Sequence, residues 1–398
     1  MRVSRIGFID AVSFALDYLE IGMHQNITNH NRRVALIAIN MGKLLGLTAD
    51  ELTDLYEYAV LHDNGVTTKA YIVMAEMGRD KLEDGQSHCV VGQKNIEHFP
   101  FFAQHGEVIR YHHEAYDGSG FFGLVGEQIP LFSQIIALAD VAEIAYRKTG
   151  SRKQTIAKIR GDIGSKYAQR IGAAFLSAAT HSALWLGMGD MFVSAELVRT
   201  IPGSACTIDT PELIKIARAI AAIVDAKSPF TGTHTQGIAE KIGVMSDVYA
   251  FDAEHRDKLT LAAYLHDVGK LVVPDTILDK PGKLTEDEFE IIKAHAYYTK
   301  MMLFSVPGFE EIARWAGEHH EKLNGTGYPY GLGQKDLDFE SQMMACVDIY
   351  QALTEDRPYR AALSHEDAIM ILSGMAKRGE VNAQIVLDMQ AVGAKLKK

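Results

Sequence analysis

The chain is organised around residues 263–270, which read AYLHDVGK. The apolar residues before the His-Asp pair are typical of a buried helix, and the pair at its end brings an imidazole nitrogen and a carboxylate to one point. Gly269 allows another backbone segment to approach closely, and Lys270 adds a positive charge beside Asp267. The stretch therefore predicts one part of a metal site that acts on an anionic substrate.

The composition is that of a folded protein with more than one domain. The 398 residues suit two domains of about 200 residues each. The formal net charge of −11 argues against polymeric nucleic acid or a membrane as a partner, since both favour an excess of Lys and Arg. The three cysteines are an odd, sparse set that forms no disulfide framework, which fits a reducing cytoplasm, and none is in a CxxC pair, which argues against a thiolate zinc site. The sequence has no run of about 18 apolar residues, so no transmembrane helix is predicted.

The fold class predicted from the sequence is all-α. Most apolar residues recur at three- and four-residue spacing, which indicates amphipathic helices, and strand patterns are scarce. Two helix starts carry a capping box, Thr48 with Glu51 and Thr285 with Glu288, in which each side chain satisfies a free backbone N–H of the first turn. We therefore expect bundles of helices.

The chain contains an internal repeat. LHDNG at 61–65 matches LHDVG at 265–269, and the same interval of 32 residues leads to the His-Asp pair from an earlier histidine in each copy. Core packing does not require histidines at matched places, so the match favours a ligand role. The matched residues are His30, His62, Asp63, His88, His112, His113 and Asp140 in the first copy, and His234, His266, Asp267, His295, His319, His320 and Asp348 in the second.

The repeat sets the expected domain boundaries. Residues 1–22 are expected to form an added amphipathic helix, and residues 23–185 the first domain. A linker with room for a connecting helix is placed at 186–205, where glycine and proline mark loose points, and 206–398 form the second domain. The two domains are thus tandem helical bundles related by duplication.

The seven ligand-type residues of the second copy are too many for one ion. Adjacent residues on a helix point about 100° apart, so each His-Asp or His-His pair can serve two neighbouring metals, with Asp267 as the bridge. Two metals about 3.5–4 Å apart activate a water and clamp a phosphoryl group. Imidazole and carboxylate ligands suit Fe, Mn, Zn or Ni and do not choose between them.

The second copy resembles the HD-GYP family, a branch of the HD-domain metal phosphohydrolases that hydrolyse bacterial cyclic dinucleotides. The resemblance covers about residues 215–385 and rests on the ligand series, on HDVGK at 266–270, on NGTGYP at 324–329 and on ALTEDRPYR at 352–360. It implies an all-helical fold and a centre of two or three metals, usually iron or manganese. The implied product is a linear dinucleotide or mononucleotides.

Carried over by position, the resemblance implies that the seven matched residues of the second copy are metal ligands, with Asp267 and Lys270 as catalytic residues. Lys270 would hold a non-bridging phosphate oxygen, the GYP loop would shape the substrate wall, and two arginines would meet phosphate or a guanine face. The implied substrate-binding residues are Lys270, Gly325, Gly327, Tyr328, Pro329, Arg357 and Arg360.

Three positions depart from the family pattern. Trinuclear members carry a carboxylate where this chain has Phe230, so two divalent metals are expected, iron or manganese first and nickel or zinc as alternatives. Ser228 and Gln351 stand where family members often carry Asp, which affects proton handling around the metals rather than metal binding.

The first copy keeps every ligand type but lacks the substrate residues. Val66 replaces the lysine, GFF at 120–122 replaces GYP, and the RPYR segment has no counterpart. We interpret this copy as a degenerate HD domain that retains a second metal site and has a regulatory or structural role. A separate hydrolase acting on another phosphate substrate stays open.

The resulting prediction is a metal-dependent phosphodiesterase that hydrolyses c-di-GMP, 3′,3′-cGAMP or both through a metal-bridging hydroxide. Two alternatives remain: a phosphomonoester hydrolase of the HD superfamily, and a non-catalytic sensor of cyclic dinucleotides. The sequence does not rank the two substrates, and it leaves open a homodimer formed through exposed helices.

Overall fold

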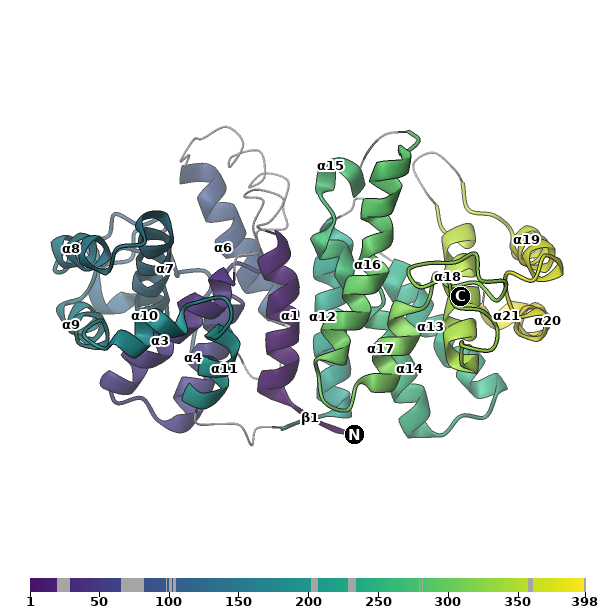
Figure 1. Cartoon of the computed structure of the whole chain (residues 1–398), viewed down its shortest axis with the longest axis horizontal. Coiled ribbons are helices and arrows are strands. Elements are labelled where there is room, and N and C mark those ends of the chain that lie inside the picture. The colour runs from purple at the N-terminus through teal and green to yellow at the C-terminus, as the bar shows by residue number, and fades with distance from the viewer. Residues whose placement is uncertain are drawn as a thin grey trace. The chain divides into compact units, whose positions relative to one another are not determined.

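The computed structural model describes residues 1–19, 29–65, 82–97, 99, 102, 105–201, 207–227, 234–278, 280, 282–356 and 361–396. Within these ranges the chain is helical apart from irregular segments, the longest at 105–125 and 318–338, and one two-stranded sheet (Figure 1). The sheet pairs β1 (Arg2–Ser4) with β2 (Thr207–Asp209). The all-α prediction is confirmed.

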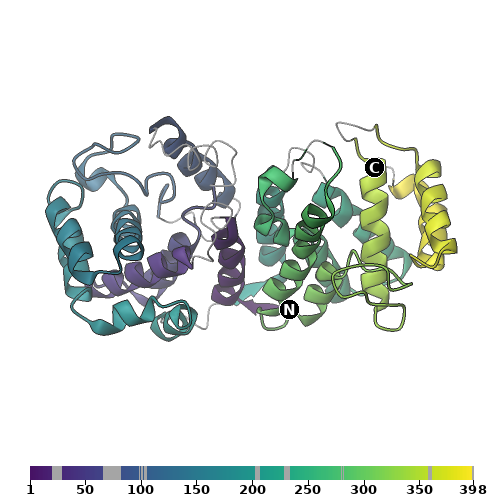
Figure 2. The ribbon, with the colours of Figure 1, turned by 45° about the horizontal axis from the view of Figure 1, so that its top comes forward.

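The chain divides into two compact units. The N-terminal unit comprises Ser4–Thr207, and the C-terminal unit comprises Met1–Val3 with Ile208–Lys398. In Figures 1 and 2 the helices of the first run from purple to teal and those of the second from teal-green to yellow. The described part of 186–205 includes helix α11 (Val193–Thr200), which packs on the N-terminal unit's helix α3 (His30–Leu44).

Helix α3 forms the centre of the N-terminal unit. It packs against α4, α7, α9 and α11, and its residues Val34 to Ile39 are almost completely buried. The remaining helices are α1 (Arg5–Leu19), α4 (Ala49–Val60), α6 (Leu82–Ile96), the 3-10 helix η1 (Gly126–Gln128), α7 (Leu131–Thr149), α8 (Arg152–Asp162), α9 (Gln169–Ala178) and α10 (Ser182–Gly187).

Helix α14 (Ala253–Leu265), which ends directly before the His-Asp pair, lies at the centre of the C-terminal unit. It packs against α12, α13 and α17, and Leu261 to Ala263 at its end are fully buried, as the opening stretch predicts. The other helices are α12 (Thr210–Lys227), α13 (His234–Val248), η2 (Val268–Val272), α15 (Asp275–Leu278), α16 (Glu286–Phe304), α17 (Glu310–Gly317), α18 (Phe339–Thr354), α19 (His365–Lys377), α20 (Ala383–Ala391) and α21 (Gly393–Leu396).

Both predicted capping boxes are present. At the start of α4, the amide of Glu51 donates to Thr48 Oγ1 at 3.3 Å, and the amide of Thr48 donates to the Glu51 carboxylate at 2.8 Å. At the start of α16, the same pair of bonds joins Thr285 and Glu288 at 3.2 and 2.7 Å. None of the described helices has the length and apolar character that crossing a bilayer requires.

Candidate metal centre

The C-terminal unit brings the seven predicted ligand residues to one place. Asp267 lies between two groups: its Oδ2 is 3.1 Å from His266 Nε2, and its Oδ1 is 3.5 Å from His295 Nε2. A carboxylate in that position can bridge two cations. The two groups, within each of which all ligand atoms lie within 4.8 Å of one another, are His234, His266 and Asp348, and His295, His319 and His320.

Each predicted ligand lies where a helix begins or ends, or on the inner face of a long helix. The helix termini direct polar side chains inward without breaking the apolar packing of the bundle. His234 begins α13, His266 and Asp267 follow the last residue of α14, His295 lies in α16, His319 and His320 follow α17, and Asp348 lies in α18.

Backbone carbonyls orient three of the imidazoles. The Nδ1 atoms of His266, His295 and His319 lie 2.8, 2.6 and 2.6 Å from the carbonyl oxygen three residues earlier. Each ring therefore donates through Nδ1 and presents the lone pair of Nε2 to the cluster. Burial lowers the pKa of His295 to about 4 and that of His320 to about 3, which keeps both rings neutral.

Two buried polar atoms of the cluster are suited to bind a cation. Among the described residues, His266 Nε2 and Asp267 Oδ1 have no hydrogen-bond partner, although both are inaccessible to water. Such orphaned atoms are rare in folded proteins, because leaving them unsatisfied costs free energy. A lone-pair nitrogen and a carboxylate oxygen facing one point are what a divalent metal would satisfy.

Glu355 supports His234, a role that the sequence did not reveal. His234 Nε2 lies 3.1 Å from Asp348 Oδ1, and its Nδ1 lies 3.0 Å from the Glu355 carboxylate. Burial lowers the pKa of His234, but the hydrogen bonds to Asp348 and Glu355 outweigh it and raise the pKa to about 9. A carboxylate behind a ligand histidine fixes its orientation and raises its basicity.

Lys270 lies at the bridging carboxylate. Its ammonium group donates to Asp267 Oδ2 across one turn of η2. The predicted catalytic pair is therefore together at the point where the two ligand groups meet. A cation there can also attract an anionic phosphoryl group.

Gly269 holds the His-Asp pair against α16. A Cβ at Gly269 would lie 2.0 Å from the carbonyl oxygen of His295, so only glycine permits this approach. Thr299 closes the contact, because its hydroxyl donates to the carbonyl of His266 and accepts from the amide of Gly269, both at 2.9 Å. The close backbone contact expected at Gly269 thus determines how far His266 and Asp267 stand from His295.

The GYP loop is anchored behind the histidines. The Glu321 carboxylate accepts from the amides of Tyr330 and Leu332 at 2.7 and 2.9 Å. A Cβ at Gly327 would lie 2.4 Å from the amide nitrogen of Lys322. The loop therefore folds directly onto the segment that carries the His-His pair.

The predicted substrate residues of this loop differ in their positions. The Tyr328 ring lies 4.7 Å from that of His320, centroid to centroid, and Pro329 follows it through a cis peptide bond. Gly325 lies in an exposed turn with a φ of 75°, which favours glycine. Arg357 and Arg360 lie outside the described residues, as do Val66, Ser228 and Phe230.

The N-terminal unit has a similar cluster of His and Asp side chains. His30 Nε2 lies 3.3 Å from Asp140 Oδ1, and Asp63 is 3.3 Å from His62 Nε2 and 3.5 Å from His88 Nε2. The ligand atoms of His30, His62 and Asp140 lie within 4.8 Å of one another. All seven predicted residues of this copy therefore lie in one cluster, which His112 and His113 complete.

Supporting contacts in the N-terminal unit are matched only in part. A Cβ at Gly65 would lie 2.1 Å from the carbonyl oxygen of His88, as at the corresponding glycine of the other copy. The carboxylate behind His30 is Glu143, whose Oε2 lies 2.7 Å from Nδ1. Glu143 follows Asp140 by about one helical turn, whereas Glu355 follows Asp348 by about two. Alignment of the two copies therefore does not match Glu143 with Glu355.

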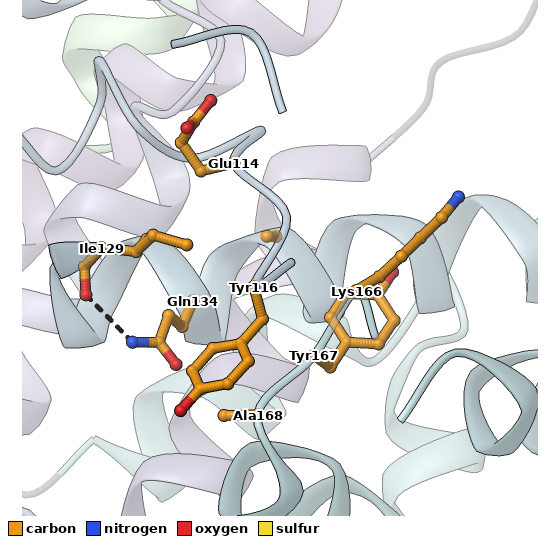
Figure 3. Close-up of a pocket in the computed structure, with 8 residues that line it drawn as sticks. Glu114, Tyr116, Ile129, Gln134, Lys166, Tyr167 and Ala168 are labelled. Carbon is orange, nitrogen blue, oxygen red and sulfur yellow. Dashed lines mark hydrogen bonds between the residues drawn. The ribbon is translucent and has the colours of Figure 1, made fainter. Parts of the chain in front are cut away.

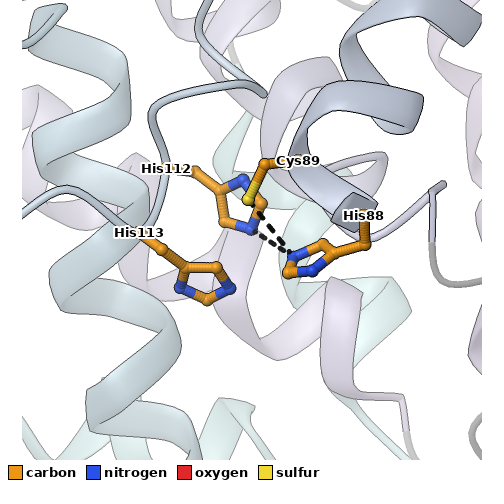
Figure 4. Close-up of side chains that lie close together, drawn as sticks. All are labelled: His88, Cys89, His112 and His113. Atoms are coloured by element: carbon orange, nitrogen blue, oxygen red, sulfur yellow. Dashed lines mark hydrogen bonds between the residues drawn. The ribbon is translucent and has the colours of Figure 1, made fainter. Parts of the chain in front are cut away.

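Cys89 is a further member of the N-terminal cluster that the sequence analysis missed. It directly follows His88, and its Sγ lies 3.6 Å from His88 Nε2 (Figure 4). Burial raises the pKa of the thiol, but attraction to the His112 and His88 side chains outweighs it and lowers the pKa to about 7. Because the chain has no CxxC pair, the sequence argued against a thiolate ligand. The signal that could have indicated this thiol is its position directly after a predicted ligand histidine.

A recess of the N-terminal unit is lined by residues that include Glu114, the neighbour of His113 (Figure 3). Tyr116, Gln134 and Tyr167 line it, and the Gln134 amide donates to the carbonyl of Ile129 at 2.9 Å. No group of metal-ligand side chains gathers among its lining residues. The recess is therefore not a candidate metal site, whereas the histidine clusters are.

The chain is similar in sequence and fold to known proteins. The chain is 29% identical over 373 residues to 3′3′-cGAMP-specific phosphodiesterase 1 of Vibrio cholerae, covering 90% of this chain and 85% of that protein. It is 35% identical over 274 residues to 3′3′-cGAMP-specific phosphodiesterase 3 of the same organism, covering 69% and 58%. A crystal structure of a cyclic GMP-AMP-specific phosphodiesterase of V. cholerae superposes with a TM-score of 0.70 at 26% identity, covering 100% of this chain and 98% of that chain.

The family model described as HD domain matches residues 20–171 and 218–385, one segment in each copy. The two matched segments carry the two histidine clusters and account for most of the chain. The resemblance to HD-GYP proteins is confirmed, and the chain belongs to the HD domain family.

Proposed function

We propose that the chain is a metal-dependent phosphodiesterase that hydrolyses 3′,3′-cGAMP, c-di-GMP or both at its C-terminal unit. The observation that carries the proposal is the Asp267 carboxylate between two groups of histidines, in a chain similar over 90% of its length to a 3′3′-cGAMP-specific enzyme. The similarity to cyclic di-GMP phosphodiesterases over shorter segments keeps that substrate in the proposal.

Two divalent cations fit the donor set. His234, His266 and Asp348 would hold one, His295, His319 and His320 the other, and Asp267 would bridge them. When bound, such cations lower the pKa of water and polarise phosphoryl oxygens. Mixed imidazole and carboxylate ligands suit iron or manganese, with nickel and zinc as alternatives.

The protein's own groups would position the substrate. Lys270, held at Asp267 in the structure, would offer its ammonium to a non-bridging phosphate oxygen, an interaction that strengthens as negative charge develops. Tyr328 and Pro329 would form a wall beside His320, where an aromatic ring can stack on a base. Arg357 and Arg360 would bind phosphate or a guanine face, as the sequence pattern suggests.

The two units would have different roles. We assign catalysis to residues 206–398, and a regulatory or structural role to residues 23–185, which lack the lysine and the GYP loop. The small, odd number of cysteines, which forms no disulfide framework, supports a reducing, cytoplasmic location. Light scattering on the purified chain would distinguish a monomer from the homodimer that the sequence leaves open.

The test is hydrolysis by a His266→Ala/Asp267→Ala variant. The wild-type chain, incubated anaerobically with Fe(II) or Mn(II), should open 3′,3′-cGAMP or c-di-GMP to a linear dinucleotide, and the variant should not. His62→Ala/Asp63→Ala makes the same change in the other copy and should retain turnover. Full activity of the first variant in metal-replete form would overturn the site assignment.

Product analysis separates the alternatives. Release of phosphate from nucleotide monoesters, with cyclic substrates left intact, would identify a phosphomonoesterase instead. Tight binding of a cyclic dinucleotide without turnover in either metal would identify a sensor.

A further inference from the structure

The two histidine clusters differ at one buried position beside a ligand. In the N-terminal unit Cys89 follows His88 on α6, whereas in the C-terminal unit Ala296 follows His295 on α16. Both side chains are fully buried. The N-terminal cluster thus has a thiol at the position where the C-terminal cluster has a methyl group.

The thiol lies among nitrogen ligands at distances that suit a tetrahedral metal. Cys89 Sγ is 3.6 Å from His88 Nε2, which is 3.3 Å from His112 Nε2 (Figure 4). Zinc binds sulfur at about 2.3 Å and nitrogen at about 2.0–2.1 Å, so a tetrahedron has S–N edges of about 3.6 Å and N–N edges of about 3.4 Å. Both observed separations agree with these edges.

His113 is the fourth residue of this group with a potential ligand atom. Its ring packs 5.0 Å from that of His88 and 4.1 Å from that of His112, centroid to centroid. The ligand atoms of these three histidines and Cys89 all lie within 4.8 Å of one another. His112 Nδ1 lies 2.5 Å from the carbonyl of Ile109, so its Nε2 directs a lone pair at the other ligands.

We propose that the N-terminal unit binds a zinc-type ion through Cys89, His88, His112 and His113, in a closed site that differs from the C-terminal centre. The thiol loses its proton when it binds the metal. A thiolate with imidazoles selects a softer ion than imidazoles with carboxylates do. Four protein ligands leave no open position for water, which is typical of a structural metal site.

The plainer alternative is a buried cysteine that only packs and donates a weak S–H hydrogen bond. It predicts no metal–sulfur bond and no change in metal content when the thiol is removed. The two accounts therefore differ in a spectroscopic signature that does not depend on activity.

The experiment loads the full-length chain with Co(II) and records its absorption spectrum. The wild-type chain should show a thiolate-to-cobalt charge-transfer band in the near ultraviolet, with visible bands of tetrahedral intensity. Cys89→Ala places here the alanine that the C-terminal unit has at position 296. This variant should lose the charge-transfer band. Its zinc affinity at this site should fall by at least about 10–100-fold, the cost of losing even an outer-shell partner.

Two further variants make the result specific. Cys346→Ala removes a buried thiol of the C-terminal unit and should keep the band. Ala296→Cys should add a thiolate beside His295 and strengthen the band. Circular dichroism of metal-free Cys89→Ala checks its fold, and Cys89→Ser serves if that variant does not fold. An unchanged band and zinc content in Cys89→Ala, or no band in the wild-type chain, would overturn the proposal.

Discussion

Replacing Gly269 by alanine would test how the His-Asp pair is held on α16. The added Cβ would lie 2.0 Å from the carbonyl oxygen of His295 and 2.8 Å from the amide nitrogen of Thr299. Both are backbone atoms of a helix and cannot rotate away. The strain must therefore move η2 and α16 apart.

The size of the movement follows from the contact distances. Ordinary contact begins near 3.4 Å, so relief of the clash at 2.0 Å requires a displacement of about 1.4 Å. Ligand distances in a metal site tolerate only about 0.2 Å. Overpacking of this kind costs about 1–3 kcal/mol of unfolding free energy, and a misplacement of about 1 Å lowers a catalytic rate about 100-fold.

The assay measures kcat for 3′,3′-cGAMP and metal content on the same preparation. Gly269→Ala should lower kcat about 100-fold and reduce metal bound at the C-terminal centre. Gly161→Ala in α8 is the control, because no atom lies within 4 Å of the added Cβ. Gly65→Ala introduces the matched strain in the other unit and should affect metal binding there. Wild-type rate and metal content in Gly269→Ala would refute the reasoning.

Three further changes follow from the contacts of the C-terminal unit. Glu355→Gln removes the charged acceptor behind His234 and should weaken metal affinity about 10–100-fold in a metal titration; unchanged affinity would contradict its supporting role. Glu321→Gln leaves one loop amide without its carboxylate oxygen and should raise KM about tenfold with a smaller effect on kcat; an unaltered KM would separate the loop from substrate binding. In the metal-free chain, burial and the nearby Asp267 raise the pKa of Asp225 to about 6, so the folded state holds this proton more tightly than the unfolded state does. The free energy of unfolding should then fall between about pH 4 and pH 6, and urea titrations of Asp225→Asn should lack that part of the slope; an identical slope in both proteins would rule out Asp225 as its source.

Much of the architecture could be predicted because its causes are local. The spacing of apolar residues predicted helices, and Thr48 with Glu51 predicted a cap that needs only one turn of backbone to form. The repeat predicted the ligand sets, since histidines at matched places have no packing explanation. The glycine of the His-Asp motif predicted a close backbone contact, although not that its partner would be the carbonyl of His295.

Contacts between distant segments could not be predicted. His234 and Glu355 are 121 positions apart, and His30 and Glu143 are 113 apart. Whether such residues meet depends on the packing of whole helices. The two copies also take this carboxylate from different turns, so even the repeat gave no guide.

The sequence by itself determined that this protein is a duplicated helical protein with two matched sets of His and Asp residues of metal-ligand type, only one of which is accompanied by the lysine and the GYP loop. Those features depend on residue type and spacing, which can be read directly from the sequence. The tertiary structure alone decided which carboxylates support the ligand histidines and that Cys89 joins the N-terminal cluster. The reason is physical: ligand geometry requires atoms from separate helices to converge within a few ångströms, and only packing sets those distances.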